Sequence, residues 1–196
     1  SPEPSAERLG DLIERVQTGD ADLGIANDGD ADRIGVVTPE RGFLDASLFF
    51  AAVYDFLLGG HEGAAVRTVS TSSIVDRVAA AHDELVYETP VGFKWVAEAM
   101  ADNDALMGGE ESGGFGVRGH VRNKDGVIVA LLAAAATADQ HLDERVRELE
   151  ADHGEIHQDR ISVDCPDDRK APVIADLDAA LPEEIAGTAV ERVNDV

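Results

Sequence analysis

The stretch Asn27-Asp28-Gly29-Asp30-Ala31-Asp32-Arg33 places three carboxylates at every second position, with small residues between them and an arginine after them. Apolar residues before it, at 22–26, and after it, at 34–37, predict two short strands. The aspartates therefore lie on a tight turn at the end of a strand. Hard divalent cations such as Mg²⁺ take several oxygen ligands. This turn can supply three of them from one segment of backbone, which makes it a candidate Mg²⁺ site.

Other interpretations of this turn differ in what they require of the sequence. An EF-hand counted from Asp28 would need Gly at its sixth position and Glu at its twelfth, where the chain has Arg33 and Pro39. A Mg²⁺-dependent phosphatase with Asp28 as its nucleophile also carries Asp-x-Asp after a strand, and it stays open. A solvated acidic turn without an ion stays open too, because aspartate is abundant along the whole chain.

The composition indicates a globular protein. The chain has 196 residues, of which 44% are apolar, too many for a disordered tail. It has no run of eighteen apolar residues and no signal-peptide pattern at its start, so we expect no membrane span and a cytoplasmic location. Cys165 is the single cysteine, which excludes an intrachain disulfide. The first residue is Ser1 rather than Met, which suggests processing or a boundary within a longer chain.

The net charge is strongly negative. Sixteen basic residues against 40 acidic ones give −24, and the acids are spread along the chain. Such a charge strains a compact fold by self-repulsion, which salt screens. We interpret the acidity as a halophilic adaptation to a salt-rich cytoplasm. Nucleic acid is not an expected partner, because the chain offers no basic face for phosphates.

Helical and strand-like segments alternate along the chain. Helices are expected at 5–17, 46–58, 73–82, 93–101, 127–138, 145–149 and near 174–181. Strands are expected at 22–26, 34–37, 43–44, 64–69, 85–87, 106–107, 156–163 and 188–193. Ser73 is expected to cap its helix, with Asp76 as the capping-box partner. The alternation predicts an α/β fold with mixed, mainly parallel sheet layers flanked by helices.

Two loops downstream carry further polar chemistry. The segment Gly108-Gly109-Glu110-Glu111-Ser112-Gly113-Gly114 follows a predicted strand, at the end where open α/β sheets bind ligands. Its carboxylates and hydroxyl suit a polyol. The segment His120-Val121-Arg122-Asn123-Lys124-Asp125-Gly126 places two cations and a histidine before a helix start, which suits a phosphate. An ordinary flexible loop and a solvated helix entry are the alternatives.

Four segments together carry a resemblance to a known family. In chain order they are the aspartate turn, the run Thr89-Pro90-Val91-Gly92-Phe93-Lys94, the loop 109–114 and the segment 120–126. They resemble the α-D-phosphohexomutases, the family of phosphoglucomutase and phosphomannomutase, most firmly over 20–140. The resemblance implies four domains around a cleft and a phosphoserine that phosphorylates a hexose phosphate. It also implies a hexose bisphosphate intermediate and Mg²⁺ as the cofactor.

The resemblance implies roles for individual residues. The implied metal ligands are Asp28, Asp30 and Asp32. The implied substrate contacts are Glu110, Ser112, His120, Arg122 and Lys124. The implied assisting residues in catalysis are Arg33 and Lys94.

The sequence also departs from the family pattern. The nucleophile loop of Thr-Ala-Ser-His-Asn-Pro type and the phosphate-clamping loop of Arg-x-Ser-Gly-Thr-Glu type have no counterpart, and Ser72 and Ser73 read as helix caps. We therefore expect 1–41 to be the end of domain 2, 42–150 to be domain 3, and 151–196 to be a truncated start of domain 4. Such a fragment, without domain 1 and most of domain 4, should be inactive alone. A non-catalytic sugar-phosphate-binding module is the further alternative, and the choice among glucose, mannose and glucosamine phosphates stays open.

Overall fold

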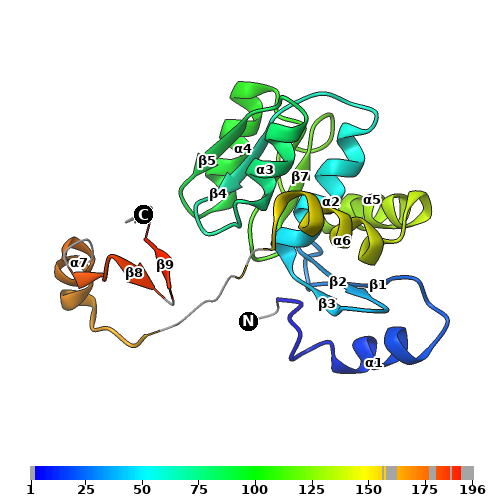
Figure 1. The fold of residues 1–196 in the computed structure, drawn as a ribbon, viewed down its shortest axis with the longest axis horizontal. Helices are drawn as coiled ribbons and strands as arrows, with labels where there is room; N and C mark the ends of the chain where they lie inside the picture. Colours follow the sequence, from blue (N-terminus) through cyan, green and yellow to red (C-terminus); the bar gives the residue numbers. More distant parts are fainter. Residues whose placement is uncertain (1–2, 156, 158–162, 177–179, 186, 191–196) are drawn as a thin grey trace. The chain divides into compact units, whose positions relative to one another are not determined.

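The computed structural model describes residues 3–155, 157, 163–176, 180–185 and 187–190. The chain divides into two compact units, Ser1–Ile156 and His157–Val196, and each is described separately. The first unit contains two β-sheets with helices packed against them (Figure 1). The second is a small helix-and-hairpin unit.

The aspartate turn belongs to a small antiparallel sheet. Its strands are β1 (Gly24–Asn27), β2 (Ile34–Thr38) and β3 (Gly42–Leu44), in that order. The three predicted strands are confirmed. Every residue of β2 is buried, because helix α1 (Gly10–Thr18) packs against this sheet and the main core lies nearby. The first helix begins at Gly10 rather than at residue 5 as predicted.

The second sheet has four strands in the order β5-β4-β6-β7. Strand β4 (Ala65–Thr68) pairs in parallel with β5 (Val86–Thr89) and with β6 (Met107–Gly109). Strand β7 (Phe115–Val117) returns antiparallel to β6. This is the mixed, mainly parallel sheet that the sequence predicted, but β7 was not predicted. The carboxyl ends of β4, β5 and β6 meet at one edge, as in other parallel sheets.

Helices cover both faces of this sheet. On one face lie α2 (Ala46–Leu58), α3 (Ile74–Ala81) and α5 (Gly126–Asp139), and α6 (Leu142–His153) packs on α2 and α3. Helix α4 (Phe93–Asn103) packs on the other, where it contacts Val66. Phe49 and Phe50 of α2 each lie 5.5 Å from the ring of Phe115, and the same core contains Ile34. One hydrophobic core therefore joins both sheets and fixes the aspartate turn relative to β6 and β7.

A buried carboxylate attaches α6 to the first sheet. Asp143 is 5% exposed, and it accepts hydrogen bonds from the Thr38 hydroxyl at 2.6 Å and from the Glu40 amide at 3.0 Å. A buried carboxylate is tolerated when donors satisfy it in this way. The helix runs over Leu142–His153, well beyond the predicted 145–149.

The predicted capping box at α3 was wrong. The side chain of Ser73 accepts no capping hydrogen bond, and the amide of Ile74 donates to Ser72 Oγ instead, at 3.3 Å. Asp76 pairs with the buried Arg67 of β4, with Nε and Oδ2 2.6 Å apart, and Glu88 pairs with the same guanidinium at 2.9 Å. Neutralising a buried arginine is the stronger demand on Asp76, because an unpaired buried charge is costly.

The second unit contains α7 (Asp167–Ala175) and a hairpin of β8 (Glu184–Ile185) with β9 (Thr188–Ala189). Residues 177–179 of the helix predicted near 174–181 lie outside the described residues, and its first two residues belong to the end of α7. Helix α7 begins directly after Pro166, where two aspartates in the first turn suit the positive end of the helix dipole. The strand predicted at 156–163 and the end of the one at 188–193 lie almost wholly outside the described residues. No helix among the described residues is long and apolar enough to span a membrane.

Candidate active site

The turn between β1 and β2 is held by hydrogen bonds within residues 27–33. The amide of Ala31 donates to the carbonyl of Asp28 at 3.1 Å, and the Asn27 side chain donates to the carbonyl of Arg33 at 2.8 Å. Ala31 has a φ of 58°, in the left-handed region that few side chains adopt. The turn is therefore held in an unusual conformation that points its aspartates to a common side.

The three carboxylates lie close together. Asp28, Asp30 and Asp32 each offer one oxygen, and these oxygens lie within 4.8 Å of one another. The Asp28 side chain is only 2% exposed, whereas Asp30 is exposed. Three carboxylate oxygens with water access on one side are a donor set that fits Mg²⁺, which keeps several water or phosphate ligands.

Two cations border the carboxylate cluster. The ammonium of Lys124 lies 3.0 Å from Asp32 Oδ2. The Nε atom of Arg33 lies 4.0 Å from Asp28 Oδ2 and 3.9 Å from Asp32 Oδ1. This Nε atom is buried and has no hydrogen-bond partner among the described residues. A buried donor aimed at such a cluster leaves a place for an anionic or water ligand.

The glycine-rich loop docks onto the start of β2. Its ends close on each other, since the amide of Glu110 donates to the Gly114 carbonyl at 3.0 Å. The amide of Ile34, directly after the aspartate turn, donates to the Gly113 carbonyl at 2.9 Å. Gly113 has a φ of 86°, and a Cβ atom there would lie 2.5 Å from the Ile34 carbonyl oxygen, so glycine is required. The contact brings the two polar loops together.

Glu110 is the buried carboxylate of this loop. It is 7% exposed, and it accepts a hydrogen bond at 3.0 Å from the amide of Gly92, at the start of α4. Burial raises the pKa of Glu110, although the Gly92 amide and the charge of Lys124 act in the opposite direction. Lys124 therefore acts electrostatically on both the aspartate turn and the glycine-rich loop.

Replacing Glu110 with Gln should stabilise the chain at neutral pH. Because the folded-state pKa of Glu110 is raised, its ionisation costs stability. That cost is absent below about pH 4, grows as the pH rises towards the folded-state pKa, and is fully present above it. Urea unfolding of Glu110→Gln should thus match the parent at low pH and exceed it at pH 7. Glu98→Gln, at an exposed position of α4, controls for the loss of one charge. Equal gains in both variants at pH 7 would contradict this account.

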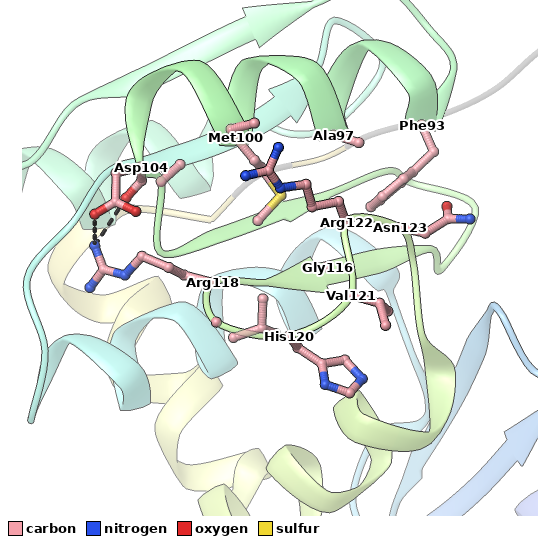
Figure 2. A pocket seen from close by; sticks show the side chains of 14 residues that line it. Phe93, Ala97, Met100, Asp104, Gly116, Arg118, His120, Val121, Arg122 and Asn123 are labelled. Carbon is pink, nitrogen blue, oxygen red and sulfur yellow. Dashed lines mark hydrogen bonds and ion pairs between the residues drawn. The ribbon is translucent and has the colours of Figure 1, made fainter.

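The remaining predicted residues lie further apart. His120 Nε2 is 2.9 Å from Asp125 Oδ2, and that carboxylate caps α5. Arg122 lines a hollow of about 320 Å³ beside α4, where it extends towards Met100, whereas His120 points away from α4 (Figure 2). Lys94 is exposed and lies 4.1 Å above the Trp95 ring. The structure thus brings together the three aspartates, Arg33, Lys124 and the loop that carries Glu110 and half-buried Ser112; it does not cluster His120, Arg122 and Lys94 with them.

Three contacts that shape the site were not predicted from the sequence. The amide of Gly126 donates to the carbonyl of Ala31 at 2.9 Å, which ties the start of α5 to the aspartate turn. Gly92 supplies the amide for Glu110. Glu111 accepts hydrogen bonds from Ser70 and Thr68. For Gly92 and Gly126 the sequence offered only glycines between polar residues, which do not show which backbone segments approach each other.

Two family models match this α/β/α unit. The model described as phosphoglucomutase/phosphomannomutase, alpha/beta/alpha domain III, matches residues 45–153, and the corresponding domain II model matches residues 1–42. The chain belongs to the phosphoglucomutase/phosphomannomutase family.

Individual relatives agree. The chain is 37% identical over 131 residues to a phosphoglucomutase/phosphomannomutase of Thermococcus kodakarensis, which covers 65% of this chain and 28% of the relative. It is 35% identical over 158 residues to phosphoglucomutase-1 of Bos taurus, which covers 75% of this chain and 27% of the relative. The chain therefore spans under a third of the length of these two relatives.

Solved structures share the fold. A Thermus thermophilus protein described as a phosphomannomutase superposes with a TM-score of 0.71 at 34% identity, over 77% of this chain and 36% of that one. The fold extends to Aspergillus fumigatus N-acetylphosphoglucosamine mutase, solved with GlcNAc-6P and magnesium. Its TM-score is 0.52 at 15% identity, over 74% of this chain and 36% of that one.

Proposed function

We propose that this chain is the metal-binding and sugar-binding part of a phosphohexomutase. Such an enzyme interconverts hexose 1-phosphate and hexose 6-phosphate through a phosphoserine and a hexose bisphosphate intermediate. The observation that carries the proposal is the contact between the two loops. The hydrogen bond from Ile34 to Gly113 and the position of Lys124 hold a three-carboxylate cluster beside a carboxylate-and-hydroxyl loop.

Each part of the site has a proposed role in phosphoryl transfer, which depends mainly on positioning and on stabilising charge. Asp28, Asp30 and Asp32 would hold Mg²⁺, which supplies positive charge next to the migrating group. Arg33 and Lys124 would contact the phosphoryl oxygens. Glu110 would accept hydrogen bonds from sugar hydroxyls, and Ser112 would donate hydrogen bonds to them or accept from them. Outer contacts to the substrate would come from Lys94, His120 and Arg122.

We propose that the phosphoserine is supplied by residues outside this chain. Ser72 is 8% exposed and its hydroxyl accepts from a backbone amide, which supports a structural role. In the same scheme, 1–41 would be part of domain 2, 42–150 domain 3, and 151–196 the beginning of domain 4.

The test is turnover and binding with the purified chain. Incubation with glucose 1-phosphate, glucose 1,6-bisphosphate and Mg²⁺ should give no glucose 6-phosphate. Calorimetry should nevertheless detect weak, Mg²⁺-dependent binding of glucose 1-phosphate. Formation of glucose 6-phosphate above a blank would contradict the proposal that the phosphoserine lies outside this chain. Absence of any binding would contradict the proposed sugar-phosphate site.

A phosphatase is the second candidate, and release of inorganic phosphate in the same assay would favour it. It requires Asp28 as the nucleophile. However, the Asp28 side chain is 2% exposed and accepts a hydrogen bond from the amide of Arg33 at 3.2 Å. A nucleophile needs access to the phosphorus atom, so these contacts favour the mutase.

We propose in addition that the acidity is an adaptation to a salt-rich cytoplasm. The net charge is −24, and the Debye length falls from about 10 Å at 0.1 M salt to about 3 Å at 1 M. Screening should therefore raise the urea midpoint as KCl increases from 0.1 to 2 M. Choline chloride should act similarly if screening is the cause. A midpoint that stays constant or falls would contradict the adaptation.

A further inference from the structure

We propose that Glu111 is a positioning residue that clamps the glycine-rich loop, residues 110–114, to the carboxyl end of β4. This inference rests on the proposed function, because the clamp matters for catalysis only if Glu110 and Ser112 bind the sugar. Its structural part can be tested without any ligand.

The clamp consists of hydroxyl donors on one carboxylate oxygen. Glu111 Oε2 accepts a hydrogen bond from Ser70 Oγ at 2.6 Å and another from Thr68 Oγ1 at 3.2 Å. Thr68 is fully buried as the last residue of β4, and its hydroxyl lies 2.9 Å from that of the buried Thr71. Hydrogen bonds to an ionised acceptor are about twice as strong as neutral ones, so this contact can order a loop.

The position of the clamp complements the other attachments of the loop. Glu110 is tied to the start of α4 through the Gly92 amide, and Gly113 is tied to β2 through the Ile34 amide. Both attachments lie at the ends of the loop. Glu111 is next to Ser112 at the tip, and it supplies a third attachment, to a different strand. Three attachments to separate elements fix both the position and the orientation of a short loop.

The adjacent carboxylates of Glu110 and Glu111 also carry an electrostatic cost. Burial is the main cause of the raised pKa of Glu110, and the neighbouring charge of Glu111 raises it further. The hydroxyls of Ser70 and Thr68 hold the Glu111 carboxylate at the end of β4. The Glu110 carboxylate, in contrast, is acted on by the charge of Lys124.

The acceptor oxygen should matter more than the charge, because a neutral amide oxygen still accepts from the hydroxyls, although through weaker hydrogen bonds. Glu111→Gln keeps an oxygen that can accept from Ser70, whereas Glu111→Ala removes it. Ser70→Ala removes the closer donor. Glu98→Ala, an exposed acid on α4, serves as the matched control for the loss of a carboxylate.

The experiment measures amide hydrogen exchange by NMR and glucose 1-phosphate binding by calorimetry in the presence of Mg²⁺. In Glu111→Ala, exchange at the amides of Glu110 and Gly113 should accelerate about tenfold, while Val66 in the centre of the sheet is unchanged. Ser70→Ala should accelerate exchange less than Glu111→Ala does. In the double variant the two effects should not add. Glu111→Gln should stay within about threefold of the parent chain, and Glu98→Ala should match it. Binding of glucose 1-phosphate should weaken at least about fivefold in Glu111→Ala only.

The outcomes separate the clamp from the proposed function. Unchanged loop exchange in Glu111→Ala overturns the clamp, whatever happens to binding. Faster loop exchange with unaltered glucose 1-phosphate affinity overturns the positioning role. Faster loop exchange in a chain that never binds glucose 1-phosphate supports the clamp and counts against the proposed function. An equal acceleration at Val66 would show general destabilisation and overturn the proposal, as would a Glu111→Gln variant that behaves like Glu111→Ala.

Discussion

Replacing Asp30 with Asn is expected to weaken divalent-cation binding at the aspartate turn by at least about tenfold. Even residues that only support a metal ligand cost 10–100-fold in affinity when changed, so a direct ligand should cost no less. Asp30 is the most informative of the three, because it is exposed and no hydrogen bond of its side chain is found among the described residues. Its removal should leave the turn intact. Asp28, by contrast, is buried against Arg33 and would confound ligation with folding.

The effect on stability should have the opposite sign. Without a cation, three carboxylates within 4.8 Å of one another repel, so Asp30→Asn should unfold at slightly higher urea than the parent chain. A gain in stability together with a loss of metal binding in Asp30→Asn would identify the three aspartates as a functional cluster. It also excludes misfolding as the cause of the lost binding.

The measurement uses Mn²⁺ as a paramagnetic substitute for Mg²⁺. Titration should broaden the amide signals of residues 28–33 first in the parent chain, and only at much higher concentration in Asp30→Asn. Asp102→Asn, on the exposed side of α4, removes the same charge and corrects for general attraction of cations to an acidic chain. Equal weakening in both variants would mean that Asp30 acts only through net charge.

The sequence predicted the features that depend on neighbouring residues. The aspartate turn, its two strands and α2 are each encoded within at most 13 consecutive positions, by alternating carboxylates or by an apolar run. Strand β7 was not predicted, because its local sequence carries little information. It is three residues long, and Gly116 at its centre gives no strand signal. Its pairing with β6 depends on packing of Phe115 against α2.

Contacts between distant segments could not be predicted. Glu111 reaches Thr68 and Ser70 across about forty positions of sequence, because β4 and β6 are neighbours in the sheet. His120, Arg122 and Lys124 appeared as one cationic cluster, but their side chains take different directions. The amide of Asp125 pairs with the Phe115 carbonyl, so this segment runs beside β7. Lys124 reaches Asp32, whereas Arg122 lies against α4.

Gly126→Ala is expected to destabilise the chain by about 2 kcal/mol and to displace the aspartate turn, because it overpacks a rigid contact. A Cβ atom at this position would lie 2.4 Å from Asn27 Nδ2, 2.7 Å from the Arg33 carbonyl oxygen and 2.9 Å from the Ala31 carbonyl oxygen. Two of these atoms are backbone and belong to the turn itself. They cannot move away without breaking the hydrogen bond from Gly126 to Ala31 that ties α5 to the turn.

The matched control is Gly10→Ala. Gly10 and Gly126 are each the first residue of a helix, but an added Cβ at Gly10 meets nothing within 4 Å. Alanine is normally preferred to glycine in a helix by up to about 1 kcal/mol, so Gly10→Ala should be neutral or stabilising. The difference between the two variants in urea unfolding therefore isolates the steric contact from helix propensity. If Gly126→Ala were as stable as Gly10→Ala and bound Mn²⁺ like the parent chain, the close approach of α5 to the aspartate turn would not be what positions the metal ligands.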